Sequence, residues 1–219
     1  MNIDRKKEFI SFLIESNVLI FGDFTTKSGR KTPYFINTGN FKTAKQFNIL
    51  GHFYAELVYN SKVLYDALFG PAYKGIPLVL SCCNALYTDY KLNKPFFFNR
   101  KEEKDHGEGG NFIGYTPKKN EEIIIVEDVL TAGTAVKEVL PILKFCFDVS
   151  CSNLFVLVDR CEVSVNSSNR ASLELKEKFN ITVNSLVDIK DILKFLSLNE
   201  KFKEHKESMQ NYIQKFCIL

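Results

Sequence analysis

The chain has 219 residues, of which 45% are hydrophobic and 25% charged, and its formal net charge is +3. This balance fits one globular α/β domain with a modest appendage better than two full domains. The charge is too small to suggest a nucleic-acid partner but suits an anionic substrate, and no apolar run approaches the roughly 20 residues that span a membrane.

The N-terminus and the cysteines predict a cytoplasmic protein. Residues 1–16 do not form a secretory signal, because their apolar residues are few and interleaved with polar ones and no small-residue cleavage site follows. The six cysteines show no C-x-x-C spacing, which disfavours a zinc site. Several lie in apolar stretches, as core thiols of a reducing compartment do.

Hydrophobic periodicity predicts helices and strands in alternation. We expect a helix over 4–16, short strands and turns over 21–41, a helix over 45–59, a strand over 66–69, a turn over 70–75, a helix over 76–90, strands over 96–98 and 111–115, a strand over 123–126, a helix over 132–145, a strand over 154–158, a helix over 170–179, a strand over 181–187 and two terminal helices. From residue 66 onward this order indicates an open, mostly parallel sheet with helices on both faces. Ligands of such sheets bind beyond the carboxyl ends of the strands.

The most informative stretch is IIIVEDVLTAGTAVKEV, from Ile123 to Val139. Its apolar start predicts a buried parallel strand, and its small-residue turn at 131–135 predicts free N–H groups and two hydroxyls at a helix N-terminus, which suit a phosphate monoester. Glu127 and Asp128 would then lie beside ribose hydroxyls. The chain contains neither G-x-G-x-x-G nor G-x-x-x-x-G-K-[ST], so a ribose-5-phosphate site is favoured over a dinucleotide or nucleoside-triphosphate site. A plain strand–turn–helix with its acids facing water is the simpler alternative.

Three other segments carry polar residues of interest, and two of them, residues 70–75 and 100–110, follow strands of the predicted sheet at its carboxyl edge, as do residues 159 and 160. Residues 25–37, TTKSGRKTPYFIN, taken alone predict a basic surface hairpin, and residues 70–75, GPAYKG, an ordinary turn. Residues 100–110, RKEEKDHGEGG, form a charged, glycine-rich connection that is long for a hairpin, as a catalytic lid often is. The three cations and His106 on such a lid would close over a pyrophosphate leaving group.

The segment VEDVLTAGTA resembles the phosphoribosyl pyrophosphate signature of the type I phosphoribosyltransferases. With FGDFTTKSGRKTPYF, FGPAYKG and RKEEKDHGEGG in this order, the chain resembles the orotate-specific branch of that family over about residues 4–190. The resemblance implies a single domain over 1–219, with an N-terminal helix and small hood over about 1–40, a core over about 41–200, a C-terminal helix over 200–219 and a flexible catalytic loop. It also implies transfer of phosphoribose to orotate, giving orotidine 5′-monophosphate in UMP biosynthesis, with Mg²⁺ held mainly by the substrate and not directly by the protein.

The resemblance implies three overlapping sets of site residues. Those that bind phosphoribosyl pyrophosphate are Lys27, Tyr73, Lys74, Arg100, Lys101, Lys104, His106, Glu127, Asp128, Val129, Leu130, Thr131, Ala132, Gly133, Thr134 and Ala135. Those implied in catalysis are Lys74, Arg100, Lys101, Lys104, His106 and Asp128. Those that bind orotate are Lys27, Tyr34, Phe35, Thr131 and Arg160, the last through the orotate carboxylate. A salt bridge at the end of a strand is the alternative explanation of Arg160.

Two residues depart from the family pattern: Ile36 stands where a second Phe is usual, and Glu127 where Asp is common. The resemblance implies a homodimer in which Arg100 and Lys104 reach the partner's site, and it is compatible with association with a separate orotidylate decarboxylase. Two other functions stay open: a purine phosphoribosyltransferase of the same fold, and a non-enzymatic regulator that senses phosphoribosyl pyrophosphate. The lid sequence argues against both, since it is particular to the orotate branch and keeps its basic residues.

Overall fold

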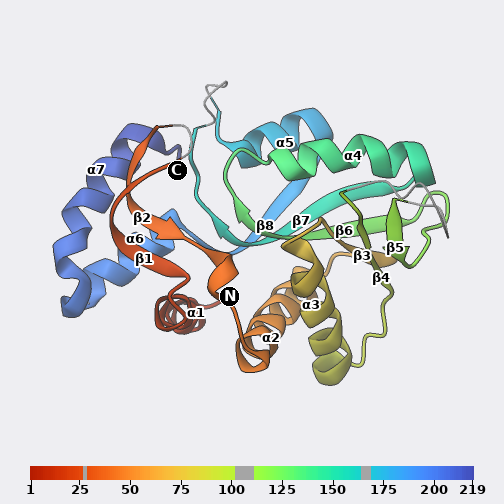
Figure 1. Ribbon diagram of the computed structural model, residues 1–219, viewed down its shortest axis with the longest axis horizontal. Helices are drawn as coiled ribbons and strands as arrows, with labels where there is room; N and C mark the ends of the chain where they lie inside the picture. Colours follow the sequence, from red (N-terminus) through yellow and green to blue (C-terminus); the bar gives the residue numbers. More distant parts are fainter. Residues whose placement is uncertain (27–28, 102–110, 164–168) are drawn as a thin grey trace.

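The computed structural model describes residues 1–26, 29–101, 111–163 and 169–219. At its centre lies a six-stranded sheet in the order β5-β4-β3-β6-β7-β8 (Figure 1). Its strands are β3 (Ala67–Gly70), β4 (Phe96–Asn99), β5 (Phe112–Gly114), β6 (Glu122–Leu130), β7 (Ser150–Asp159) and β8 (Thr182–Asp188). Only the edge strand β5 pairs antiparallel with its neighbour. The predicted open, mostly parallel α/β sheet is confirmed.

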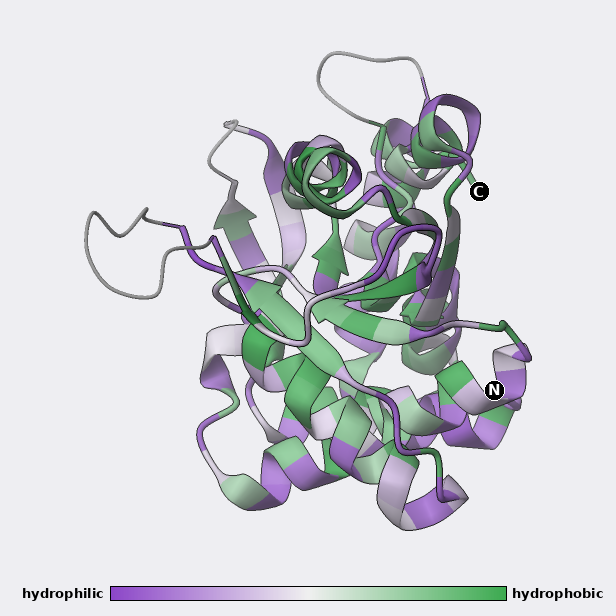
Figure 2. Cartoon of the chain, turned by 90° about the vertical axis from the view of Figure 1, so that its right-hand side faces the viewer, coloured by the Kyte–Doolittle hydropathy of each residue, from purple (hydrophilic) through white to green (hydrophobic). Residues whose placement is uncertain are grey.

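Helices cover both faces of this sheet. One face carries α2 (Ala44–Ser61) and α3 (Gly75–Tyr90), and the other carries α4 (Thr134–Phe147) and α5 (Ala171–Phe179) (Figure 1). Successive side chains of a strand point to opposite faces, so a strand covered on both sides is apolar throughout. Accordingly, Ile124 and Val126 pack in the core on the α2–α3 side, whereas Ile123 and Ile125 pack on the α4–α5 side. The central strands are hydrophobic along their length, while the helices alternate between hydrophobic and hydrophilic bands (Figure 2).

Both ends of the chain contribute to a second group of elements beside the main sheet. The N-terminal part consists of α1 (Ile3–Glu15), the antiparallel hairpin β1 (Leu19–Thr25) and β2 (Lys31–Ile36), and the short helix η1 (Thr38–Asn40). The C-terminal part consists of α6 (Ile189–Leu198), η2 (Glu200–His205) and α7 (Lys206–Phe216). Helix α6 packs on α1, and α7 packs on β2 (Figure 1). We call the hairpin together with α7 the hood.

The predicted boundary of the signature strand is wrong. The strand β6 does not end at Val126 but continues to Leu130, and α4 begins at Thr134 instead of residue 132. The reason is that β7 is longer than predicted and pairs with β6 as far as the contact between Leu130 and Asp159. The two acids therefore lie within a hydrogen-bonded strand, which fixes their backbone, and the loop before α4 is reduced to residues 131–133.

The turn from β3 to α3 depends on two glycines that touch. A Cβ on Gly70 would lie 2.4 Å from the carbonyl oxygen of Gly75 and 2.6 Å from Cγ1 of Val79. The Gly75 amide donates to the Pro71 carbonyl at 2.9 Å, which closes the turn. This close approach fixes the backbone of the intervening Tyr73 and Lys74.

Gly70→Ala should therefore destabilise the protein. Overpacking at a site with no room typically costs about 1–3 kcal/mol, and here the obstructing atom belongs to the backbone. Gly39→Ala is the matched control, because the added Cβ would meet only the side chain of Asn37, at 3.1 Å. Urea denaturation of both variants measures the free energies of unfolding; equal values for the two would contradict the packing argument.

Candidate active site at the carboxyl ends of β3 and β6

A cavity of about 400 Å³ lies where the carboxyl ends of β3 and β6 meet. From β3 the chain crosses through α3 to β4 on one side, and from β6 it crosses through α4 to β7 on the other. Ligands of open α/β sheets bind at such a reversal of strand order. The cavity is lined by Pro71, Ala72, Tyr73, Lys74, Lys101, Glu127, Asp128, Val129, Leu130, Thr131, Gly133, Thr134, Ala135, Val136, Leu154 and Val156.

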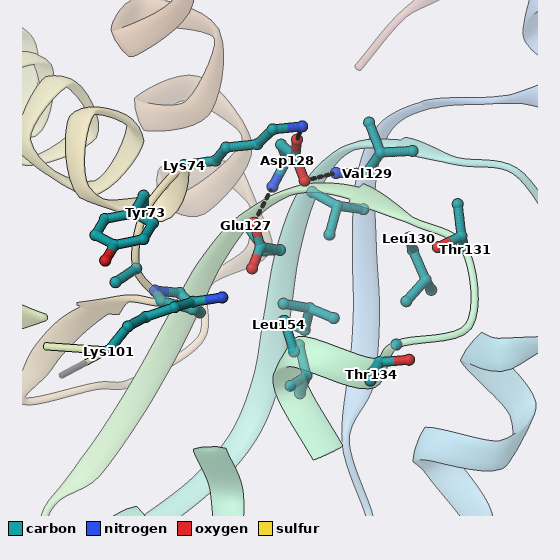
Figure 3. Close-up of a pocket in the computed structure, with 16 residues that line it drawn as sticks. Tyr73, Lys74, Lys101, Glu127, Asp128, Val129, Leu130, Thr131, Thr134 and Leu154 are labelled. Carbon is teal, nitrogen blue, oxygen red and sulfur yellow. Dashed lines mark hydrogen bonds and ion pairs between the residues drawn. The ribbon is translucent and has the colours of Figure 1, made fainter. Parts of the chain in front are cut away.

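Asp128 is held in place by hydrogen bonds from three directions. Its side chain accepts from the hydroxyl of Thr38 at 2.6 Å. It also accepts from the ammonium of Lys74 at 2.9 Å, and the Val129 amide donates to it at 2.7 Å (Figure 3). Burial, which leaves the residue 8% exposed, acts to raise the pKa of Asp128. The hydrogen bonds from Thr38 and Lys74 outweigh it, and the net pKa lies below the ordinary value. Asp128 is therefore a charged acceptor at neutral pH.

Glu127, the adjacent acid, differs in charge. Burial and the neighbouring Asp128 carboxylate raise the pKa of Glu127 to about 8, although its own carboxylate accepts a hydrogen bond from the Asp128 amide at 2.9 Å. Two adjacent acids that titrate as a pair avoid carrying two charges at once. At neutral pH the pair thus offers one charged acceptor and one carboxyl that also donates, a combination suited to two neighbouring hydroxyl groups.

The loop of residues 131–133 leads into the N-terminus of α4. Gly133 has a φ of 68°, in the left-handed region that favours glycine, and no side chain caps the helix. The first-turn amides and the hydroxyls of Thr131 and Thr134 are therefore available to an anion, which the helix dipole also favours. Lys137 steadies this loop by donating to the Ala132 carbonyl at 2.8 Å and bonding Glu174 at 2.7 Å.

Basic and aromatic side chains line the opposite side of the cavity. Lys74 extends across to Asp128, and the ammonium of Lys101 lies 5.7 Å from the centre of the Tyr73 ring (Figure 3). Arg100 faces a neighbouring hollow instead, which it lines with Asn99, Asn111, Glu138 and others. The predicted residues Lys27, Lys104 and His106 lie outside the described residues.

The described residues predicted to bind orotate lie in three places. Thr131 lines the cavity, whereas Phe35 lies on the hood, 41% exposed and 5.5 Å from the Phe24 ring. Tyr34 and Arg160 are buried together behind the hairpin, with the Arg160 guanidinium 4.4 Å from the Tyr34 ring centre. The backbone of Arg160 is nevertheless next to the cavity, because its amide donates to the Leu130 carbonyl at 3.3 Å.

The sequence did not point to several residues that shape the cavity. Thr38 and Lys137 were missed, as was Asn99, whose side chain accepts from the Ala72 amide at 2.9 Å. Tyr54 donates to the Glu127 carbonyl from beneath the strand, at 2.5 Å. Only Lys137 carries a local signal, since it lies one helical turn after the small-residue loop. The others act across long stretches of sequence.

Within the ranges that the structure describes, no group of three or more His, Cys, Asp and Glu side chains gathers as a metal site. Asp128 provides a carboxylate and Glu127 a carboxyl group at the cavity, and carboxylate oxygens are ligands that Mg²⁺ prefers. Of the helices in the same ranges, none has the length and apolar character needed to cross a membrane.

Comparison with known proteins decides the family. A model of the phosphoribosyl transferase domain matches residues 38–190. An orotate phosphoribosyltransferase of Clostridium acetobutylicum is 50% identical over 192 residues, which are 87% of this chain and 85% of that protein. The chain belongs to the orotate phosphoribosyltransferase family.

Two further members of the family extend the match over nearly the whole chain. The orotate phosphoribosyltransferase of an Escherichia coli O45:K1 strain is 39% identical over 213 residues, 97% of this chain and 98% of that protein. The crystal structure of the Francisella tularensis orotate phosphoribosyltransferase superimposes with a TM-score of 0.85 at 36% identity, covering 96% of this chain and all of that one. These findings confirm the resemblance and the type I phosphoribosyltransferase-like fold expected from the sequence.

The raised pKa of Glu127 predicts how stability depends on pH. Between the ordinary value of 4.5 and about 8, the folded protein keeps a proton that the unfolded chain releases. The free energy of unfolding should therefore decrease as pH rises through this window, and Glu127→Gln should flatten that decrease. Urea denaturation at pH 5.5, 7 and 8.5 measures both slopes. The control is Glu138→Gln, at an exposed position on α4; identical slopes for all three proteins would show that Glu127 is not responsible.

Proposed function

We propose that the chain transfers the 5-phosphoribosyl group from phosphoribosyl pyrophosphate to orotate, giving orotidine 5′-monophosphate and pyrophosphate in UMP biosynthesis. The observation that carries the proposal is one cavity that combines the acid pair of β6, the uncapped N-terminus of α4 and the cations Lys74 and Lys101. These three features match the hydroxyls, the 5-phosphate and the pyrophosphate of the donor. Family membership supports the same reaction.

Donor binding follows from this arrangement. The 5-phosphate would accept hydrogen bonds from the amides at the start of α4 and from Thr131 and Thr134. The ribose hydroxyls would then face Glu127 and Asp128, and the pyrophosphate would extend toward Tyr73 and Lys74. Because Lys74 is bonded to Asp128, an arriving pyrophosphate would compete for the ammonium and leave an Asp128 oxygen for a hydroxyl.

Catalysis requires that negative charge on the leaving group be neutralised while the ribose ring gains positive, oxocarbenium-like character. Lys74 and Lys101 line the cavity and would neutralise this charge. Donors aimed at developing charge are worth most where water is excluded. Mg²⁺, when bound to the pyrophosphate and ribose hydroxyls, would supply further neutralisation. The predicted lid residues Lys104 and His106 would close over the same group. The nucleophile needs positioning only, because orotate requires no covalent activation.

Arg160 is the residue proposed to select the base. A guanidinium binds a carboxylate through two parallel hydrogen bonds, which a neutral pyrimidine or a purine cannot offer. Its backbone is fixed beside Leu130, one residue before Thr131, which places both proposed orotate contacts at neighbouring strand ends. Cytoplasmic location, the homodimer with shared lid residues and any association with a decarboxylase stay predictions.

Turnover with a panel of bases tests the proposed function. Loss of the ultraviolet absorbance of orotate is followed after adding phosphoribosyl pyrophosphate and Mg²⁺, with uracil, hypoxanthine, guanine and adenine as parallel substrates. Turnover of orotate alone is expected. Turnover of a purine would instead establish a purine enzyme, and binding of the donor without turnover of any base would favour a regulator.

Removal of the Thr38 hydroxyl should weaken donor binding. Thr38→Val deletes the hydrogen bond that positions the Asp128 carboxylate for a ribose hydroxyl. We expect the Kd for phosphoribosyl pyrophosphate, measured by titration calorimetry, to rise roughly tenfold, the effect of one hydrogen bond to a charged group. Thr88→Val is the matched control, since this hydroxyl also donates to a carboxylate, that of Asp89 at 3.0 Å, but on α3 away from the cavity. Equal affinities of the two variants would remove Thr38 from the site.

A further inference from the structure

A buried cluster of charged and aromatic residues joins Arg160 to the hood. Glu162, only 8% exposed, lies at its centre. One oxygen of this carboxylate accepts from Nε of Arg160 at 2.8 Å and from the Tyr212 hydroxyl at 2.5 Å, and Nη2 of Arg160 lies 2.6 Å from it. The Tyr34 hydroxyl donates to the same oxygen at 3.3 Å, and the other oxygen lies 3.5 Å from Nη1 of Arg30. The cluster thus draws on β2, the end of β7 and α7.

These contacts fix the direction of the Arg160 guanidinium. Its Nε and Nη2 lie beside one oxygen of Glu162, and its Cζ lies over the ring of Tyr34, 4.4 Å from the ring centre. The Tyr34 ring is in turn held edge-on by Tyr212, with ring centres 5.8 Å apart and planes at 87°. Among the described residues, Nη2 of Arg160 is buried and makes no hydrogen bond although it lies 2.6 Å from Glu162, so the guanidinium keeps donor capacity for another oxygen.

The charges in the cluster favour an anionic ligand. Two guanidinium groups, those of Arg30 and Arg160, share the single carboxylate of Glu162, which leaves one positive charge in excess. A buried charge is stabilised when it is paired, and a carboxylate on the incoming base would supply the missing partner. Burial and Glu162 raise the pKa of Tyr212, so its hydroxyl keeps its proton and remains a donor.

The end of α7 is tied to the segment that carries Arg160. The Val163 amide donates to the Phe216 carbonyl at 2.9 Å, and the Ile218 amide donates to the Cys161 carbonyl at 3.0 Å. Arg30 reinforces this joint from the hairpin, because its guanidinium lies 4.8 Å from the ring centre of Phe216. The C-terminal helix is therefore tied to both sides of this segment through the backbone and to Glu162, the partner of Arg160, through Tyr212.

We propose that Glu162 and Tyr212 are positioning residues for base recognition, which hold Arg160 against Tyr34 so that the C-terminal helix takes part in selecting a carboxylated base. The proposal rests on the proposed function, in which Arg160 takes the carboxylate of orotate. It assigns a role in specificity to α7, an element outside the cavity that receives the donor.

Tyr212→Phe tests the proposal, because it removes one hydroxyl and keeps the ring against Tyr34. We expect KM for orotate to rise about five- to tenfold, the effect of one hydrogen bond, with kcat and KM for phosphoribosyl pyrophosphate changed less than about twofold. Tyr115→Phe is the matched control: the Tyr115 hydroxyl also donates to a glutamate, Glu121 at 2.9 Å, but beside β5. A change in kcat and in both KM values together would indicate a general structural effect and overturn the proposal.

A double mutant separates positioning from packing. In the Arg160→Ala background, Tyr212→Phe should have no further effect on KM for orotate, since it acts only through Arg160. An undiminished effect in that background would contradict the proposal.

The single variant Arg160→Ala separates this proposal from the proposed function. If Arg160→Ala raises KM for orotate while Tyr212→Phe behaves like Tyr115→Phe, the positioning role fails and the function stands. If the wild-type protein does not turn over orotate at all, the proposed function itself fails.

Discussion

The parallel pairing of β3 with β6 is the constraint on which the site depends. These strands are joined through Ala67–Ile123, Leu68–Ile124 and Phe69–Ile125, and the helices that follow them leave to opposite faces of the sheet. As a result, the glycine-closed turn after β3 and the uncapped start of α4 face each other across the acid pair. The pairing of two buried apolar strands, a hydrophobic effect, places the two segments together at one cavity.

The acid pair in the cavity carries one negative charge instead of two at neutral pH, so only one buried carboxylate needs a partner. Of the two adjacent acids, Glu127 has a raised pKa and Asp128 a lowered one, and the charged member is satisfied by Thr38 and Lys74. A buried pair of like charges would otherwise repel strongly. Behind the hood, likewise, the single carboxylate of Glu162 pairs with two arginines, Arg30 and Arg160.

Sequence patterns were sufficient for features that are local. Periodicity located the strands and helices, and the small-residue turn after Leu130 located the helix N-terminus. The limit of β6 was missed because two consecutive acids resemble a strand end, whereas pairing with β7 keeps them in the sheet. Thr38 was missed for another reason: its partner Asp128 lies 90 residues away, and no local spacing records such a contact. Glu162 lies only two residues after its partner Arg160, but its contacts with Tyr34 and Tyr212 span 128 and 50 residues. Alternation along β2 likewise buries the side chain of Tyr34 and exposes that of Phe35, so the two side chains point to opposite faces of the hairpin.

The contact between Lys74 and Asp128 has a consequence for the design of inhibitors. A compound that offers only an anionic group would draw the ammonium away and leave the largely buried Asp128 without its cationic partner, which is unfavourable. A compound that offers only hydroxyls would compete with a lysine already in place. A scaffold that presents an anion and a diol at the spacing of these two side chains replaces both halves of the contact at once, so its two groups should bind far better joined than as separate fragments.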